Sequence, residues 1–173
     1  SDVYSLLIST DLVPVTDAEW RKQSGFRESM DLGKKIIQAK AGGRYFFIGT
    51  TDKSDGSGIT AQTNLISFPL QNDGQFPVGD VINGTSFAET ASDIIATSSG
   101  DVVAMWNSTS GFNSSTIYLA YANQAEDYEL KSGQSLPYST TFGNSIIQSV
   151  FGGYIILGEQ INTNHNKDIF LIR

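Results

Sequence analysis

The chain has 173 residues with 17 glycines, no cysteine and a formal net charge of −7. The absence of cysteine excludes disulfides, thiol catalysis and Cys-ligated metal clusters, and the acidic balance argues against nucleic acid, whose phosphates need clustered Lys and Arg. No apolar run approaches the roughly 20 residues of a membrane-spanning helix, and the length suits one domain with a sizeable core.

The N-terminal segment predicts two strands separated by a turn. Ser1–Ser9 alternates well enough for a strand, and Thr10–Asp17, which contains a proline, is typical of a turn. Asp17 could instead cap a short helix, but the register of the repeat described below favours a strand at Glu19–Gln23. The chain starts with Ser rather than Met, so we expect a mature or trimmed chain whose targeting segment is not in view.

A hairpin and two further strands follow. Ile36–Gly49 has an apolar pair, a short polar step, a Gly-Gly turn and an aromatic run, which is the pattern of two antiparallel strands. After a polar loop, Asn64–Leu70 predicts a third strand that a proline stops, and Gln75–Ile82 fits a fourth strand.

The same order of elements then returns twice. The second unit consists of a hairpin, a third strand and a candidate fourth strand, at Ile94–Trp106, Ser115–Ala122 and Asp127–Lys131. The last unit consists of a hairpin and a third strand, at Ile146–Gly158 and Lys167–Arg173. Residues 132–141, which include a proline, read as the connection between these two units.

The spacing of the hairpins defines a repeat. Ile36, Ile94 and Ile146 open the three hairpins at intervals of 58 and 52 residues, a period that is typical of propellers and solenoids. Four antiparallel strands per unit make the blade of a β-propeller. We therefore predict one all-β, β-propeller-like domain over residues 1–173 with about three four-stranded blades. The units lie roughly at residues 1–33, 34–91, 92–143 and 144–173, and the first and last units are partial.

A propeller needs at least four blades to close. The chain is therefore expected either to form a homo-oligomer whose copies complete a propeller or to be one part of a longer chain.

The repeat also resembles a known group of proteins. The segments IIQSVFGGYIILGE, KDIFLIR, DVYSLLISTD and EWRKQSGF are similar to the blade repeats of secreted or lipid-anchored bacterial β-propeller proteins. The middle unit departs from that pattern, because Ser99-Gly100-Asp101 replaces the Gly-Gly-aromatic turn. The resemblance implies the propeller fold and an extracytoplasmic location, that is periplasmic, cell-surface or secreted. It implies no activity, because the fold hosts unrelated functions.

One acidic loop is a candidate metal site. Asp52 and Asp55 are three residues apart in a loop with Ser and Gly, and their carboxylates could offer oxygen ligands to Ca²⁺. The loop lacks the third acidic ligand and the downstream Glu of an EF-hand. A solvated loop is the favoured interpretation, because Asp, Ser and Gly are the usual residues of such loops, and no cofactor is otherwise expected.

Three side chains are candidates for ligand binding. Trp20 and Tyr138 could stack on a sugar or a peptide, and Tyr138 lies beside Pro137 in a predicted loop. His165, the only histidine, lies in the final polar loop, where a surface role is more common than catalysis. Most other large aromatic residues fall in predicted strands, where packing is the default: Tyr45, Trp106, Tyr118, Tyr121, Tyr128 and Tyr154.

These observations predict a non-catalytic binding or scaffold module of a bacterial surface or secreted protein. Its ligand would be a polysaccharide or a protein, held at the face that carries the loops. The alternative is a fragment of a glycan-active propeller enzyme, which would need carboxylates converging on one face with at least one shifted pKa.

Overall fold

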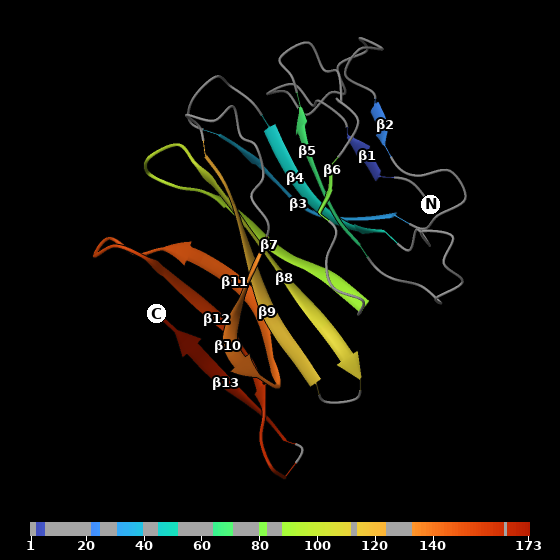
Figure 1. Ribbon diagram of the computed structural model, residues 1–173. Helices are drawn as coiled ribbons and strands as arrows, with labels where there is room; N and C mark the ends of the chain where they lie inside the picture. The colour runs from blue at the N-terminus through green and yellow to red at the C-terminus, as the bar shows by residue number, and fades with distance from the viewer. Residues whose placement is uncertain are drawn as a thin grey trace, which may run out of the picture.

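The computed structural model describes residues 3–5, 22–24, 31–39, 45–51, 64–70, 80–82, 88–111, 114–123, 133–164 and 166–173. These residues form antiparallel β-sheets, and none of them is helical. The all-β prediction is therefore confirmed for this part of the chain. The described strands form no closed barrel and no propeller ring (Figure 1).

Two of the sheets are four-stranded meanders in which consecutive strands pair. The first sheet consists of β3 (Asp31–Gln38), β4 (Tyr45–Thr51), β5 (Asn64–Leu70) and β6 (Asp80–Ile82). The middle sheet consists of β7 (Ala88–Ala96), β8 (Val102–Gly111), β9 (Ser114–Ala122) and β10 (Gln134–Ser139).

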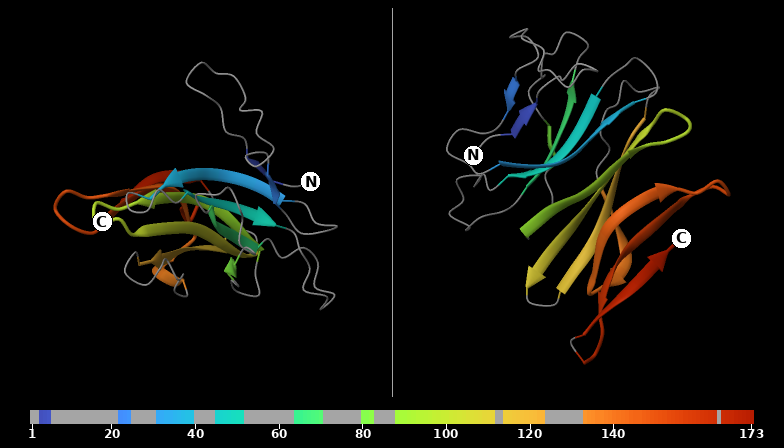
Figure 2. Two further views of the ribbon diagram at one scale, coloured as in Figure 1. Left: turned by 90° about the horizontal axis from the view of Figure 1, so that it is seen from above. Right: turned by 180° about the vertical axis from the view of Figure 1, so that it is seen from behind.

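The last sheet repeats this plan with three strands, β11 (Thr141–Gln148), β12 (Tyr154–Ile161) and β13 (Lys167–Ile172). The N-terminal pair consists of β1 (Val3–Ser5) and β2 (Lys22–Ser24). The middle sheet lies between the first and last sheets, with the N-terminal pair and β13 on opposite sides of the molecule (Figures 1 and 2). β7, the first strand of the middle sheet, contacts both β3 and β11, the first strands of the neighbouring sheets.

A β-bulge recurs at one position of each first strand. The pairing register shifts by one residue in all three hairpins, between Gly33 and Lys35, between Ala91 and Asp93, and between Gly143 and Ser145. The residues that follow the bulges are therefore equivalent positions of the repeat. They are 58 and 52 residues apart, the same intervals that separate the hairpins in the sequence.

The described residues form two apolar core clusters, one on each side of the middle sheet. The first cluster packs Ala39, Phe46 and Ile48 of the first sheet region against Ala91, Ile94, Val102, Ala104, Trp106, Ala120 and Ala122 of the middle sheet. The second cluster packs Val103, Met105 and Ile117 of the middle sheet against Ile146 and Ile156 of the last sheet.

This arrangement explains the composition of β8. Successive residues of a strand point to opposite faces of the sheet, and both faces of β8 are covered. Val102, Ala104 and Trp106 enter the first cluster, whereas Val103 and Met105 enter the second. The first half of the strand, Val102–Trp106, therefore reads as a continuous apolar run rather than an alternating one.

The structure corrects the boundaries of several predicted elements. Residues 134–139, predicted as a connection, form strand β10, in which Pro137 lies at the edge of the middle sheet. This position suits proline, because an edge strand can leave the missing N–H toward solvent. Of the strand predicted at Glu19–Gln23, the described residues Lys22 and Gln23 lie in strand β2, and the rest lies outside the described residues. The fourth strand predicted at Asp127–Lys131 lies outside the described residues.

Candidate functional site

Four of the five residues predicted to form sites lie outside the described part of the chain. These residues are Trp20, Asp52, Asp55 and His165. Tyr138 is described, and it lies on strand β10 rather than in a loop, with 44% of its surface exposed. It stands at the sheet edge because β10 pairs with β9 alone.

A pocket of about 340 Å³ lies where the middle and last sheets meet. Its walls come from four strands: Val103 of β8; Leu119, Ala120 and Tyr121 of β9; Gln134, Ser135 and Leu136 of β10; and Tyr154 of β12. The pairing of β10 with β9 is irregular between Ser135 and Ser139. Most of the side chains that line the pocket are apolar, and its polar groups are two tyrosine hydroxyls, the amide of Gln134 and the hydroxyl of Ser135.

Asp101 holds Tyr121, one of the residues that line the pocket. The Tyr121 hydroxyl and the Ser99 hydroxyl each donate a hydrogen bond of 2.5 Å to Asp101 Oδ2. Burial, and next to it the negative charge of Asp101, raises the pKa of Tyr154 above its ordinary value of 10.0. Tyr154 is therefore a neutral phenol at physiological pH, able to donate or accept a hydrogen bond.

The pocket chemistry suits a neutral ligand with one apolar face and several hydroxyls. Aromatic side chains offer ring area, and their hydroxyls offer polar contact, whereas Gln134 and Ser135 add an amide and a hydroxyl at the rim. A sugar ring has this combination of surfaces. Sequence reasoning assigned Tyr121 and Tyr154 to packing, because a strand position does not reveal whether its side chain will line a pocket between two sheets.

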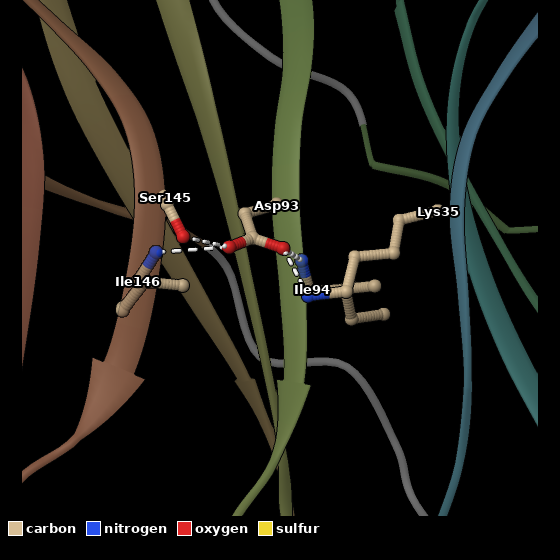
Figure 3. A network of polar contacts seen from close by, with 5 residues as sticks. All are labelled: Lys35, Asp93, Ile94, Ser145 and Ile146. Carbon is tan, nitrogen blue, oxygen red and sulfur yellow. Dashed lines mark hydrogen bonds and ion pairs between the residues drawn. The ribbon is translucent and has the colours of Figure 1, made fainter.

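A second polar cluster joins all three main sheets around Asp93 of β7 (Figure 3). Lys35 Nζ of β3 lies 2.6 Å from Asp93 Oδ1, and the backbone N–H of Ile94 donates to the same oxygen at 2.8 Å. The Ser145 hydroxyl and the Ile146 N–H of β11 donate to Oδ2, each at 2.9 Å. We call these five residues the Asp93 network.

The Asp93 network determines the charge state of its carboxylate. Burial by itself raises the pKa of Asp93, but the hydrogen bonds from Lys35, Ile146, Ser145 and Ile94 together outweigh it. The pKa of Asp93 is therefore lowered from its ordinary value of 3.8. Asp93 is a permanently ionised structural group at neutral pH, whereas a general acid needs a raised pKa.

A further polar contact occurs at equivalent positions of both sheet interfaces. Thr50 Oγ1 of β4 accepts a hydrogen bond of 3.0 Å from the N–H of Ala91. Asn107 Oδ1 of β8 accepts one of 2.8 Å from the N–H of Gly143. Ala91 and Gly143 both precede the bulge of their strand. At each bulge, the backbone N–H of the residue before the extra residue thus donates a hydrogen bond to a side chain of the preceding sheet.

The calcium prediction is untested, because Asp52 and Asp55 lie outside the described residues. Among the residues that the structure does describe, no three His, Cys, Asp or Glu side chains come together as a group of metal ligands. Within the described ranges of the chain, no helix is long and apolar enough to span a membrane.

Comparisons with protein-family models, with curated proteins and with solved structures gave no match for this chain.

Proposed function

We propose that the chain is a non-catalytic binding and scaffold module built from propeller-type blades, and that it acts outside the cytoplasm. Two four-stranded meanders, and a third sheet with the same bulged first strand, support the propeller interpretation. So does the contact of β7 with both β3 and β11, since consecutive blades of a propeller pack side by side around a centre.

The ligand that we propose is a neutral polysaccharide, bound in the pocket between the middle and last sheets. The observation that carries this proposal is the pair of tyrosines, Tyr121 and Tyr154, facing a largely apolar pocket from two different sheets. The net charge of −7 also favours a neutral ligand over an anionic one.

Asp93 favours binding over glycan cleavage. Its pKa is lowered, and both of its oxygens accept hydrogen bonds from named donors. Glycoside hydrolysis needs a carboxylic acid whose pKa is raised so that it can protonate the leaving group. The carboxylate of Asp93 is therefore arranged for joining sheets.

Saturation-transfer NMR with linear neutral oligosaccharides, followed by titration of those that bind, tests the ligand class. We expect Tyr121→Ala and Tyr154→Ala each to weaken binding by about fivefold to tenfold, because an aromatic contact contributes about 1 kcal/mol. Near-UV circular dichroism would confirm that both variants keep their fold.

Tyr138→Ala is the matched control, since Tyr138 is an exposed tyrosine of the same sheet that does not line the pocket. Its affinity should equal that of the wild type. An equal loss in all three variants would place the ligand elsewhere. If the wild type bound peptides but no oligosaccharide, the ligand class would be wrong.

A further inference from the structure

The last sheet exposes an apolar face that points away from the middle sheet. Four aliphatic side chains form it, and they are exposed to 56%, 45%, 83% and 70%: Ile147, Leu157, Ile169 and Leu171. Leu157 and Leu171 are direct partners across β12 and β13. We call these four residues the outward face of the last sheet.

The repeat shows what normally covers this face. The pairing registers put Leu157 at the position of Ile48 in the first sheet and Met105 in the middle sheet. Ile48 and Met105 are both 0% exposed, because the following sheet packs on them. Ile169 is likewise equivalent to Ile117, which is 0% exposed. The natural cover of the outward face is therefore the first strand of another sheet of the same kind.

The first sheet exposes the complementary position. Ile36 of β3 is equivalent to Ile94 and Ile146, which are 0% and 1% exposed because each packs on the sheet before it. Ile36 itself is 54% exposed, although β1 of the N-terminal pair lies beside β3. One end of the molecule thus presents the receiving face of the repeat, and the other end presents an inserting side chain.

The polar groups of the two ends also match. Glu159, whose Oε2 lies 2.7 Å from Lys167 Nζ at the surface, occupies the position of Thr50 and Asn107, which accept a backbone N–H from the next sheet. The equivalent N–H in the first sheet belongs to Gly33, which is followed directly by Lys34. An acidic acceptor on the last sheet would therefore meet a basic strand, whereas the internal interfaces use neutral acceptors.

We propose that the outward face of the last sheet binds the first sheet of a second copy, head to tail, with Ile36 of that copy inserted as Ile94 and Ile146 are inserted inside the chain. Such a heterologous contact joins copies into a closed ring or an open chain. The proposal rests on the propeller-type repeat of the proposed function but not on the pocket, so sugar binding and association can fail separately.

Light scattering on a sizing column, over a range of concentrations and without ligand, tests this association. The wild type should form a dimer or larger assembly at high concentration. Leu171→Asp and Ile36→Asp should each be monomeric, because each variant loses one of the two contact faces. Mixing these two variants should restore a dimer and nothing larger, since each contributes its intact face.

Tyr138→Asp, an equivalent change at an exposed side chain away from both faces, should associate like the wild type. A wild type that stays monomeric at every concentration would overturn the proposal. So would an Ile36→Asp variant that still associates, because this would mean that two outward faces meet each other. Urea unfolding of each monomeric variant would check that it folds as stably as the control.

Discussion

At the scale of single residues, Asp93 connects segments that are far apart in the chain. It sits just after the bulge of β7, where its carboxylate faces Lys35 of the first sheet and Ser145 of the last sheet. The side chain of Asp93 is 5% exposed, whereas that of Lys35 is 42% exposed. The ion pair is therefore partly screened by water, and the two hydrogen bonds from the last sheet add charge-assisted stabilisation to it.

We expect Asp93→Asn to lower the free energy of unfolding at pH 7 by about 2 kcal/mol, the typical contribution of hydrogen bonds to a charged group. The folded-state pKa of Asp93 lies below the unfolded value. The stabilisation is thus complete above the unfolded pKa and is lost as the pH falls through the folded pKa. Urea titrations between pH 7 and pH 2.5 should show that the free energy of unfolding falls less steeply with falling pH in this variant than in the wild type.

Asp168→Asn is the control for that measurement, because it makes the same chemical change on the exposed edge strand β13. Its unfolding curve should follow the wild type closely at neutral pH. If the acid dependence of Asp93→Asn were parallel to that of the wild type, Asp93 would not be the acid-sensitive group.

At the scale of elements, one position of the second strand is filled differently in each of the three hairpins. Gly49, Trp106 and Gly158 are equivalent positions of β4, β8 and β12. In the last sheet the Phe170 ring lies over Gly158. In the middle sheet Trp106 itself fills the space, stacked on Tyr118 with ring centroids 5.5 Å apart. The last sheet therefore places one ring at this site and the middle sheet two, whereas the first sheet pairs Gly49 with Ile66.

Gly158→Ala should destabilise the last sheet strongly. A Cβ at this position would lie 2.2 Å from the carbonyl oxygen of Phe142 and 2.5 Å from the Phe170 ring, so both the backbone and the ring would have to move. We expect a loss of about 3 kcal/mol, at the upper end of the usual range for overpacking, as a lower urea midpoint. Asn144→Ala, on the exposed side of the same hairpin, should change the midpoint little. Equal midpoints for the two variants would contradict this account.

At the scale of the whole molecule, burial falls from the middle sheet toward the last sheet. β8 is covered on both faces and is buried from Val102 to Ser108, whereas Ile169 and Leu171 of β13 are largely exposed. Covered strands open only with the whole fold, and uncovered edge strands open locally. The free energy of local opening should therefore be highest for the strands that are buried on both faces and lowest for the exposed edge strand β13.

Amide hydrogen exchange measured by mass spectrometry tests that order. At dilutions where the chain is monomeric, amides of β8 should exchange slowest and those of β13 should exchange many times faster. Raising the concentration should slow the exchange of β13, because a second copy then covers the outward face and must dissociate before the strand can open. Protection of β13 equal to that of β8 in the dilute monomer would contradict this prediction.

The sequence by itself determined the local structure of the described chain. An apolar pair, a glycine turn and an aromatic run predicted each hairpin, because these signals act between neighbouring residues. The intervals of 58 and 52 residues likewise reappear between equivalent bulge positions. Strand β10 was missed because Pro137 is a local signal against a strand, and only an edge position makes it acceptable.

Only the tertiary structure decided which groups meet. No local pattern reveals that Lys35, Asp93 and Ser145 form one network, since they lie on three sheets that pack through their side chains. The pocket tyrosines are strand residues like any others until β9, β10 and β12 are placed around a common space. Packing between sheets depends on many weak contacts over long sequence separations, and it is this packing that leaves one apolar face of the last sheet uncovered.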